Sequence, residues 1–97
     1  MSTERDFRKK FKERLLKIFP DAIITHLDPN DIQGIPDLCM FWRDRYFMFE
    51  TKRFTKASKR PNQEYYINLF DDWSYARFVQ PENMEEVLNE LEQIPFN

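Results

Sequence analysis

The first apolar pattern along the chain is helical. Over residues 4–19, apolar side chains recur every three or four positions, with lysines and arginines between them. Thr3 and Asp6 have the spacing of a capping box, and Pro20 follows the last apolar residue. We therefore expect a helix over 4–19. Its inner face would carry Phe7, Phe11, Leu15, Ile18 and Phe19.

Extended segments follow this helix. Residues 22–25 form a short β-prone run, and a polar loop over 27–35 contains the one glycine of the chain. Residues 37–42 are almost wholly apolar, and residues 46–54 are aromatic and partly alternating. Because only Arg43-Asp44-Arg45 separates these two runs, we expect them to form a β-hairpin.

The second half of the chain returns to helical spacing. A basic segment over 55–60 leads to Pro61, which suits the first turn of a helix. Residues 75–79 suit another strand, and Pro81 is expected to begin a third helix. The inner faces of the two helices would carry Tyr66, Ile67 and Phe70, and Met84, Val87, Leu88 and Leu91. The predicted order is α-β-β-β-α-β-α: one α/β domain over residues 1–97, with helices packed on a mixed sheet.

Composition narrows the class of protein. With 41% hydrophobic and 16% aromatic residues, the chain can fill one modest core, and it is unlike a disordered segment. A single cysteine, Cys39, excludes an internal disulfide and a multi-cysteine zinc site. There is no long apolar run and no signal-peptide core in the charged first residues. We therefore expect a cytoplasmic protein without a membrane partner.

The net charge of −2 hides an uneven distribution. Residues 1–60 hold 14 of the 15 lysines and arginines but 9 of the 17 acidic residues. Residues 61–97 hold only Arg77 against eight acidic residues. This division permits a basic face directed at a polyanion such as DNA, although ordinary solvated helix surface would give the same counts.

The residues with the clearest chemistry lie on the predicted hairpin. Asp37 begins one strand, while Glu50 and Lys52 lie two apart on the next, so their side chains project to the same side. Charged side chains are rarely buried unless they are paired or bind a metal. The two carboxylates could hold a hard divalent cation such as Mg²⁺, with the lysine beside it. The alternative is an ordinary Glu50–Lys52 ion pair on an exposed sheet edge.

Three further acids are candidates for the same site. Glu4 falls in the middle of the apolar face of the first helix, so it is either an inward-facing acid that completes the metal shell or a solvated first-turn acid. Asp28 and Asp31 lie in the loop before Asp37 and could reach the metal, but turn formation explains them more simply. His26, the one histidine, is expected to be structural.

The spacing of these residues resembles a known signature. Gly34-Ile35-Pro36-Asp37, followed after twelve residues by Glu50-Thr51-Lys52, is similar to the motif of the PD-(D/E)XK nuclease superfamily. The likeness is strongest to its small VRR-NUC and Holliday-junction-resolvase-like members, which carry a glutamine where this chain has Gln63. It extends from Glu4 to the predicted strand near Phe78, and it implies a restriction-endonuclease-like core.

This resemblance implies an endonuclease that uses Mg²⁺, or Mn²⁺ in its place, to hydrolyse DNA phosphodiester bonds. Lys52 would orient the attacking water, and Gln63 would support the reaction by holding a water or a phosphate. The implied metal ligands are Asp37, Glu50, the backbone carbonyl of Thr51, and Glu4. The implied contacts to the DNA backbone are Arg53, Lys56, Lys59, Arg60 and the basic residues of the first helix.

The resemblance also bears on substrate and assembly. So short a chain leaves little surface for reading bases, which favours branched or junction DNA recognised by shape, and cutting two strands favours a symmetric homodimer. The small size suggests a phage or mobile-element origin. Two alternatives remain. One is a non-catalytic module that binds DNA or a partner protein, and the other is a nuclease that works only in a larger assembly, on RNA or single-stranded ends.

Overall fold

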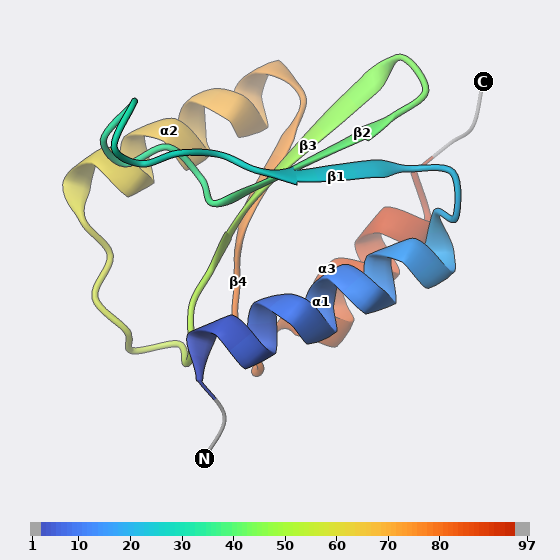
Figure 1. The fold of residues 1–97 in the computed structure, drawn as a ribbon, viewed down its shortest axis with the longest axis horizontal. Helices are drawn as coiled ribbons and strands as arrows, with labels where there is room; N and C mark the ends of the chain where they lie inside the picture. Colours follow the sequence, from blue (N-terminus) through green and yellow to red (C-terminus); the bar gives the residue numbers. More distant parts are fainter. Residues whose placement is uncertain (1–2, 95–97) are drawn as a thin grey trace.

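The computed structural model describes residues 3–94, which form one four-stranded sheet and three helices (Figure 1). The chain order α-β-β-β-α-β-α and the mixed α/β class confirm the prediction. In the described residues, no helix is both long and apolar enough to span a membrane. The elements are α1 (Glu4–Ile18), β1 (Ile23–His26), β2 (Leu38–Trp42), β3 (Arg45–Thr51), α2 (Pro61–Trp73), β4 (Tyr75–Val79) and α3 (Met84–Glu92).

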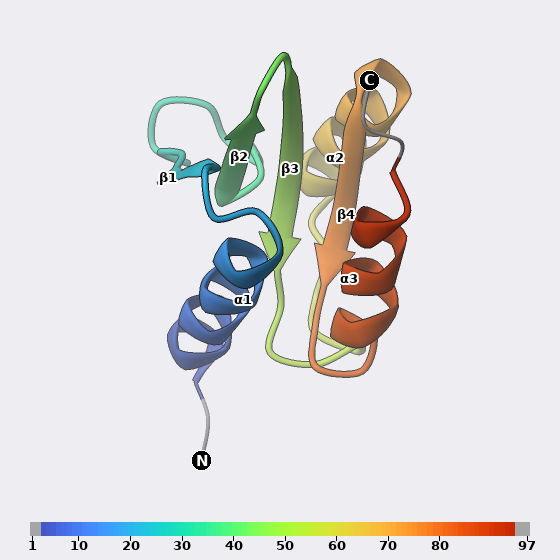
Figure 2. The same cartoon turned by 90° about the vertical axis from the view of Figure 1, so that its right-hand side faces the viewer.

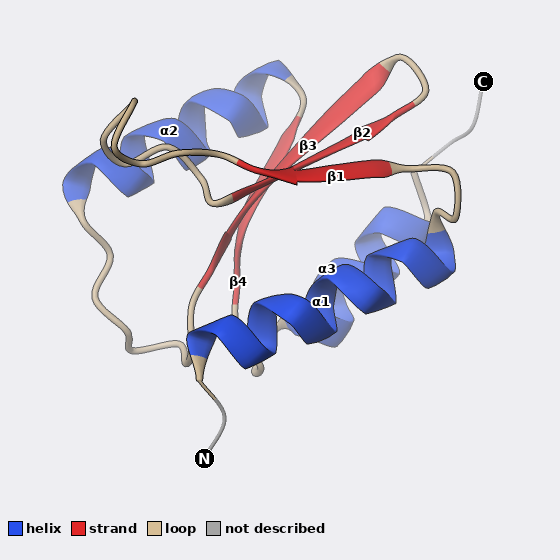
Figure 3. Cartoon of the chain, viewed as in Figure 1, coloured by secondary structure: helices blue, strands red, loops and turns tan. Residues whose placement is uncertain are grey.

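The four strands lie side by side in the order β1-β2-β3-β4 (Figure 2). β2 is antiparallel to both β1 and β3, whereas β4 runs parallel to β3. The predicted hairpin is confirmed: β2 and β3 are joined by a tight turn in which Arg43 adopts a left-handed φ of 57°. The connection from β3 to β4 contains α2, as a parallel pair of strands requires (Figure 3). β3 is therefore an inner strand with a partner on both sides.

Helices cover both faces of the sheet. α1 and α3 lie on one face and α2 lies on the other (Figure 1). Alternate residues of β3, among them Phe47 and Phe49, point toward α1 and α3, where the ring of Phe49 meets Phe11 edge-on at 5.0 Å between centroids. Arg14 of α1 donates two hydrogen bonds of 2.7 Å to Glu85 of α3, which ties these two helices together.

Some predicted boundaries were wrong. The strand expected to reach Phe54 ends at Thr51, and the Phe54 side chain is exposed. β4 ends at Val79, so the parallel partner of β3 stops there; the last backbone bond runs from the Lys52 N–H to the Val79 carbonyl at 2.8 Å. The third helix begins at Met84 rather than near Pro81. The Thr3–Asp6 capping box is confirmed.

Candidate active site

A polar cavity of about 990 Å³ lies where β3 leads into the connection to α2. Its walls come from the start of α1, the loop before β2, the end of β3 and the start of α2. Segments far apart in the sequence therefore meet around one space. The charged and amide side chains in its lining include Glu4, Asp37, Glu50, Lys52, Arg60 and Gln63.

Glu50 and Lys52 lie on the same side of β3, as their spacing predicts. Both residues are buried, with 5% and 8% of their surface exposed, and the Lys52 Nζ is 3.9 Å from the Glu50 Oε2. Because β3 is an inner strand and both side chains are buried, the structure excludes the alternative of an ion pair on an exposed edge.

The Glu50 carboxylate lacks the partners that a buried charge needs. No residue among 3–94 donates a hydrogen bond to it. Its one ion-pair partner among these residues is the Lys52 ammonium, which at 3.9 Å is too far away for a hydrogen bond. Burial, reinforced by the negative charge of Asp37, raises the pKa of Glu50 to about 8, while Lys52 acts in the opposite direction. A carboxylate in this position requires either a proton or a cation from the cavity.

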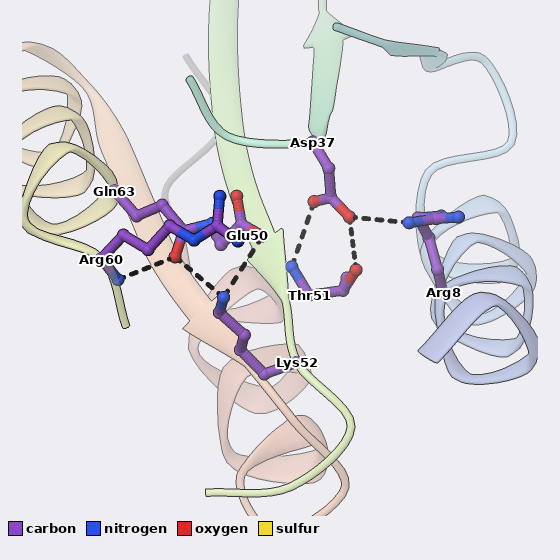
Figure 4. Close-up of polar contacts among 7 residues, drawn as sticks. All are labelled: Arg8, Asp37, Glu50, Thr51, Lys52, Arg60 and Gln63. Carbon is purple, nitrogen blue, oxygen red and sulfur yellow. Dashed lines mark hydrogen bonds and ion pairs between the residues drawn. The ribbon is translucent and has the colours of Figure 1, made fainter. Parts of the chain in front are cut away.

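Asp37 is held firmly at the entrance of β2. Its Oδ1 accepts a hydrogen bond of 3.0 Å from the Thr51 N–H, and its Oδ2 accepts one from the Thr51 hydroxyl and one of 3.2 Å from the Arg8 guanidinium (Figure 4). Oδ1 thus keeps a lone pair free for a further partner. The contact of Arg8 with Asp37 was not predicted, because it joins α1 to a residue 29 positions away.

Gln63 holds Lys52. The Lys52 Nζ donates a hydrogen bond of 2.8 Å to the Gln63 Oε1, and the same oxygen accepts the backbone N–H of Arg60 at 3.1 Å (Figure 4). The second bond belongs to the first turn of α2, so the start of that helix fixes the amide. Gln63 was expected to hold a water or a phosphate, whereas its observed partner is the lysine itself.

The loop before Asp37 is fixed against the start of α2. Gly34 has a left-handed φ of 88°, and a Cβ at this position would lie 2.4 Å from the Cβ of Asn62. Only glycine tolerates both the conformation and the close approach. Buried Pro36 follows, so the wall of the cavity and the position of Asp37 depend on the same short segment.

The other acids proposed for a metal shell are placed less favourably. Glu4 is exposed, which fits the alternative of a solvated first-turn acid, but it also lines the cavity, and its negative charge helps to raise the pKa of Glu50. Asp28 does not line it, and its Oδ1 accepts the Asn30 N–H at 2.8 Å, which confirms a turn-forming role. Asp31 is exposed and also lies outside the lining.

The basic residues expected to contact DNA are exposed in the connection from β3 to α2. Arg60 lines the cavity, whereas Arg53, Lys56 and Lys59 do not. Two of these cations lie over aromatic rings: the Lys59 Nζ is 4.8 Å from the centre of the Phe78 ring, and Arg53 is 5.4 Å from that of its neighbour Phe54. Of these four residues, Arg60 is therefore the one positioned to contact a group bound in the cavity.

The donor atoms at the cavity suit one kind of metal. Over residues 3–94, no three or more His, Cys, Asp or Glu side chains converge to hold an ion, as a zinc site would need. Mg²⁺ usually binds through one or two carboxylates and keeps several waters. The free lone pair of Asp37 and the undonated carboxylate of Glu50 fit that requirement, and these two residues would hold the ion.

Comparisons with known proteins add no relative. No family model matches the chain, and neither a curated protein nor a solved structure matches it.

Proposed function

We propose that this chain is a metal-dependent endonuclease of the PD-(D/E)XK type, which hydrolyses DNA phosphodiester bonds at the cavity. The observation that carries the proposal is the buried Glu50 carboxylate, without a hydrogen-bond donor, beside Asp37 and Lys52. Two carboxylates would repel a phosphate unless a cation offsets their charge. The spacing of the motif supports the same reading.

Each residue then has a distinct part. Asp37 and Glu50 would hold the Mg²⁺, which would supply a bound water of lowered pKa and a positive charge opposite the phosphate. Lys52 orients the attacking water and presents its ammonium to the phosphate as negative charge grows there. Gln63 positions Lys52 through the 2.8 Å hydrogen bond, and Thr51 orients Asp37 through its N–H and hydroxyl.

The proposal extends to substrate and assembly. A chain of 97 residues offers little surface for base contacts, so the substrate is branched or junction DNA selected by shape. Cutting both strands requires two cavities, and the active form is therefore a symmetric homodimer. Sedimentation tests this part: a monomer that cuts both strands of a junction would contradict it.

Cleavage tests the central claim. Labelled four-way junction, flap, duplex and single-stranded DNA are incubated with Mg²⁺ or Mn²⁺ and with each protein variant. Lys52→Ala and Asp37→Ala should each lower the cleavage rate by roughly 10²–10⁴. Lys17→Ala and Asp72→Ala are matched controls, because both residues are exposed and lie outside the cavity.

The outcomes separate the possible functions. Cleavage by the wild type and both controls, lost in the two cavity variants, supports the nuclease. DNA binding without cleavage, equal in all five proteins, would leave a non-catalytic binding module instead. Cleavage of RNA but not DNA would show that the substrate is RNA.

A further inference from the structure

A second hollow lies beside α1, and one of its lining residues, Arg8, contacts Asp37. This α1 groove encloses about 440 Å³ between α1 and the end of β1. Leu16 and His26 lie in its lining, and Glu13 is its one acid. Its cations are Arg5, Arg8, Lys9 and Lys12.

The positive charge of the α1 groove is largely unneutralised. Within residues 3–94, Arg5, Lys9 and Lys12 form no ion pair, in contrast to Arg14 on another side of the same helix. Partial burial lowers the pKa of His26, and the charges of Lys12 and Arg8 lower it further. An anion bound in the groove would therefore supply the negative charge that these cations lack.

Arg8 connects the α1 groove to the cavity. Its side chain lines the groove, while its Nη1 donates to the Asp37 Oδ2 at 3.2 Å, and Asp37 lines the cavity. A phosphate bound beside Arg8 would therefore neighbour a group bound beside Asp37.

We propose that the α1 groove binds the phosphates of duplex DNA that flank the one cut in the cavity; this rests on the function proposed above. From Arg5 to Lys12 the helix rises about 10 Å, which is about three nucleotides of one strand at 3.4 Å each. The other helices suit a polyanion poorly, because α2 and α3 contain acidic residues and no lysine or arginine.

Two double variants of the same helix test the proposal. Lys9→Gln with Lys12→Gln removes two charges from the groove, and Lys10→Gln with Lys17→Gln removes two charges from exposed positions outside it. Affinity for a duplex of about 20 base pairs is measured from about 50 to 200 mM salt by fluorescence anisotropy, with EDTA to prevent cleavage. The slope of log K against log salt should fall by about 1.8 in the groove variant, or 0.9 per lost phosphate contact, and stay unchanged in the control.

Equal slopes for the two double variants would overturn the proposal, and so would binding that is confined to an RNA duplex. Because cleavage is absent from the measurement, the result is independent of the nuclease activity. A groove-dependent slope supports the groove even if the wild type cuts no DNA, in which case the catalytic proposal alone fails.

Discussion

The two faces of the sheet are built for different purposes, and β3 contributes to both. Toward α1 and α3 it presents Phe47 and Phe49, which are buried in a continuous apolar core. Toward α2 it presents Met48 and then Glu50, and Lys52 extends the same row beyond the end of the strand. The first face gains free energy from burial, whereas the second places charges where burial opposes folding.

The direction in which a β3 side chain points therefore indicates its role: packing in the core, or chemistry at the cavity. Substitutions on the α1 and α3 face should reduce stability whatever the metal concentration. Substitutions on the α2 face near the cavity should alter cleavage and the pH dependence of stability.

Phe49→Ala should lower the free energy of unfolding by about 3–5 kcal/mol, because it leaves a cavity in a fully packed site. Urea denaturation measures the loss. Met48→Ala is the control on the opposite face, where the side chain is only half-buried, and it should cost clearly less. Equal losses at the two positions would contradict the comparison.

Glu50→Gln should act in the opposite direction. The pKa of Glu50 is raised from 4.5 to about 8, so the folded chain binds this proton more tightly than the unfolded chain does. Stability of the metal-free wild type should therefore fall as pH rises from about 4.5 to 8, by about 2–4 kcal/mol. Glu50→Gln should remove most of that slope, and Mg²⁺ should stabilise the wild type at pH 8 but not the variant.

Thermal unfolding in EDTA across this pH range checks the prediction. If Glu50→Gln is less stable than the wild type at pH 8, the carboxylate has a favourable partner in the folded protein. The claim that burial of Glu50 opposes folding would then be wrong.

Gln63→Ala should give the smallest change in stability, about 1 kcal/mol, because one acceptor for two donors is lost. Its larger effect should be on cleavage, where kcat falls about tenfold as Lys52 loses its position, while KM stays the same. Asn68→Ala, at an exposed position on α2, is the control. A change in KM alone would instead indicate a direct contact with DNA.

The periodicity of the sequence predicted most of the fold. Helical spacing identified α1, and strand alternation correctly placed Glu50 and Lys52 on one side. Such patterns work because they depend on local geometry and on which face is buried. The end of β3 was misjudged because Phe54 continues the apolar pattern beyond the last residue of the parallel partner strand.

The errors at the site have a common cause. The helical wheel put Glu4 on the inner face, but the first turn of α1 is exposed there, so angle around the helix did not determine burial. The contacts of Asp37 with Arg8 and Thr51 depend on how distant segments pack, and no spacing along the chain encodes them. Periodicity gives the direction of a side chain, and tertiary packing decides its neighbours.

The close approach of Gly34 to Asn62 limits how this chain can change in length. Two residues, Ile35 and Pro36, separate the glycine that rests on α2 from Asp37, and an insertion between them would move one away from the other. Additions between residues 28 and 32, where the loop is exposed, would leave both anchors in place. Because Pro29 and Asn30 of that exposed stretch line the cavity, added length there would reshape the cavity wall while Gly34 and Asp37 keep their places.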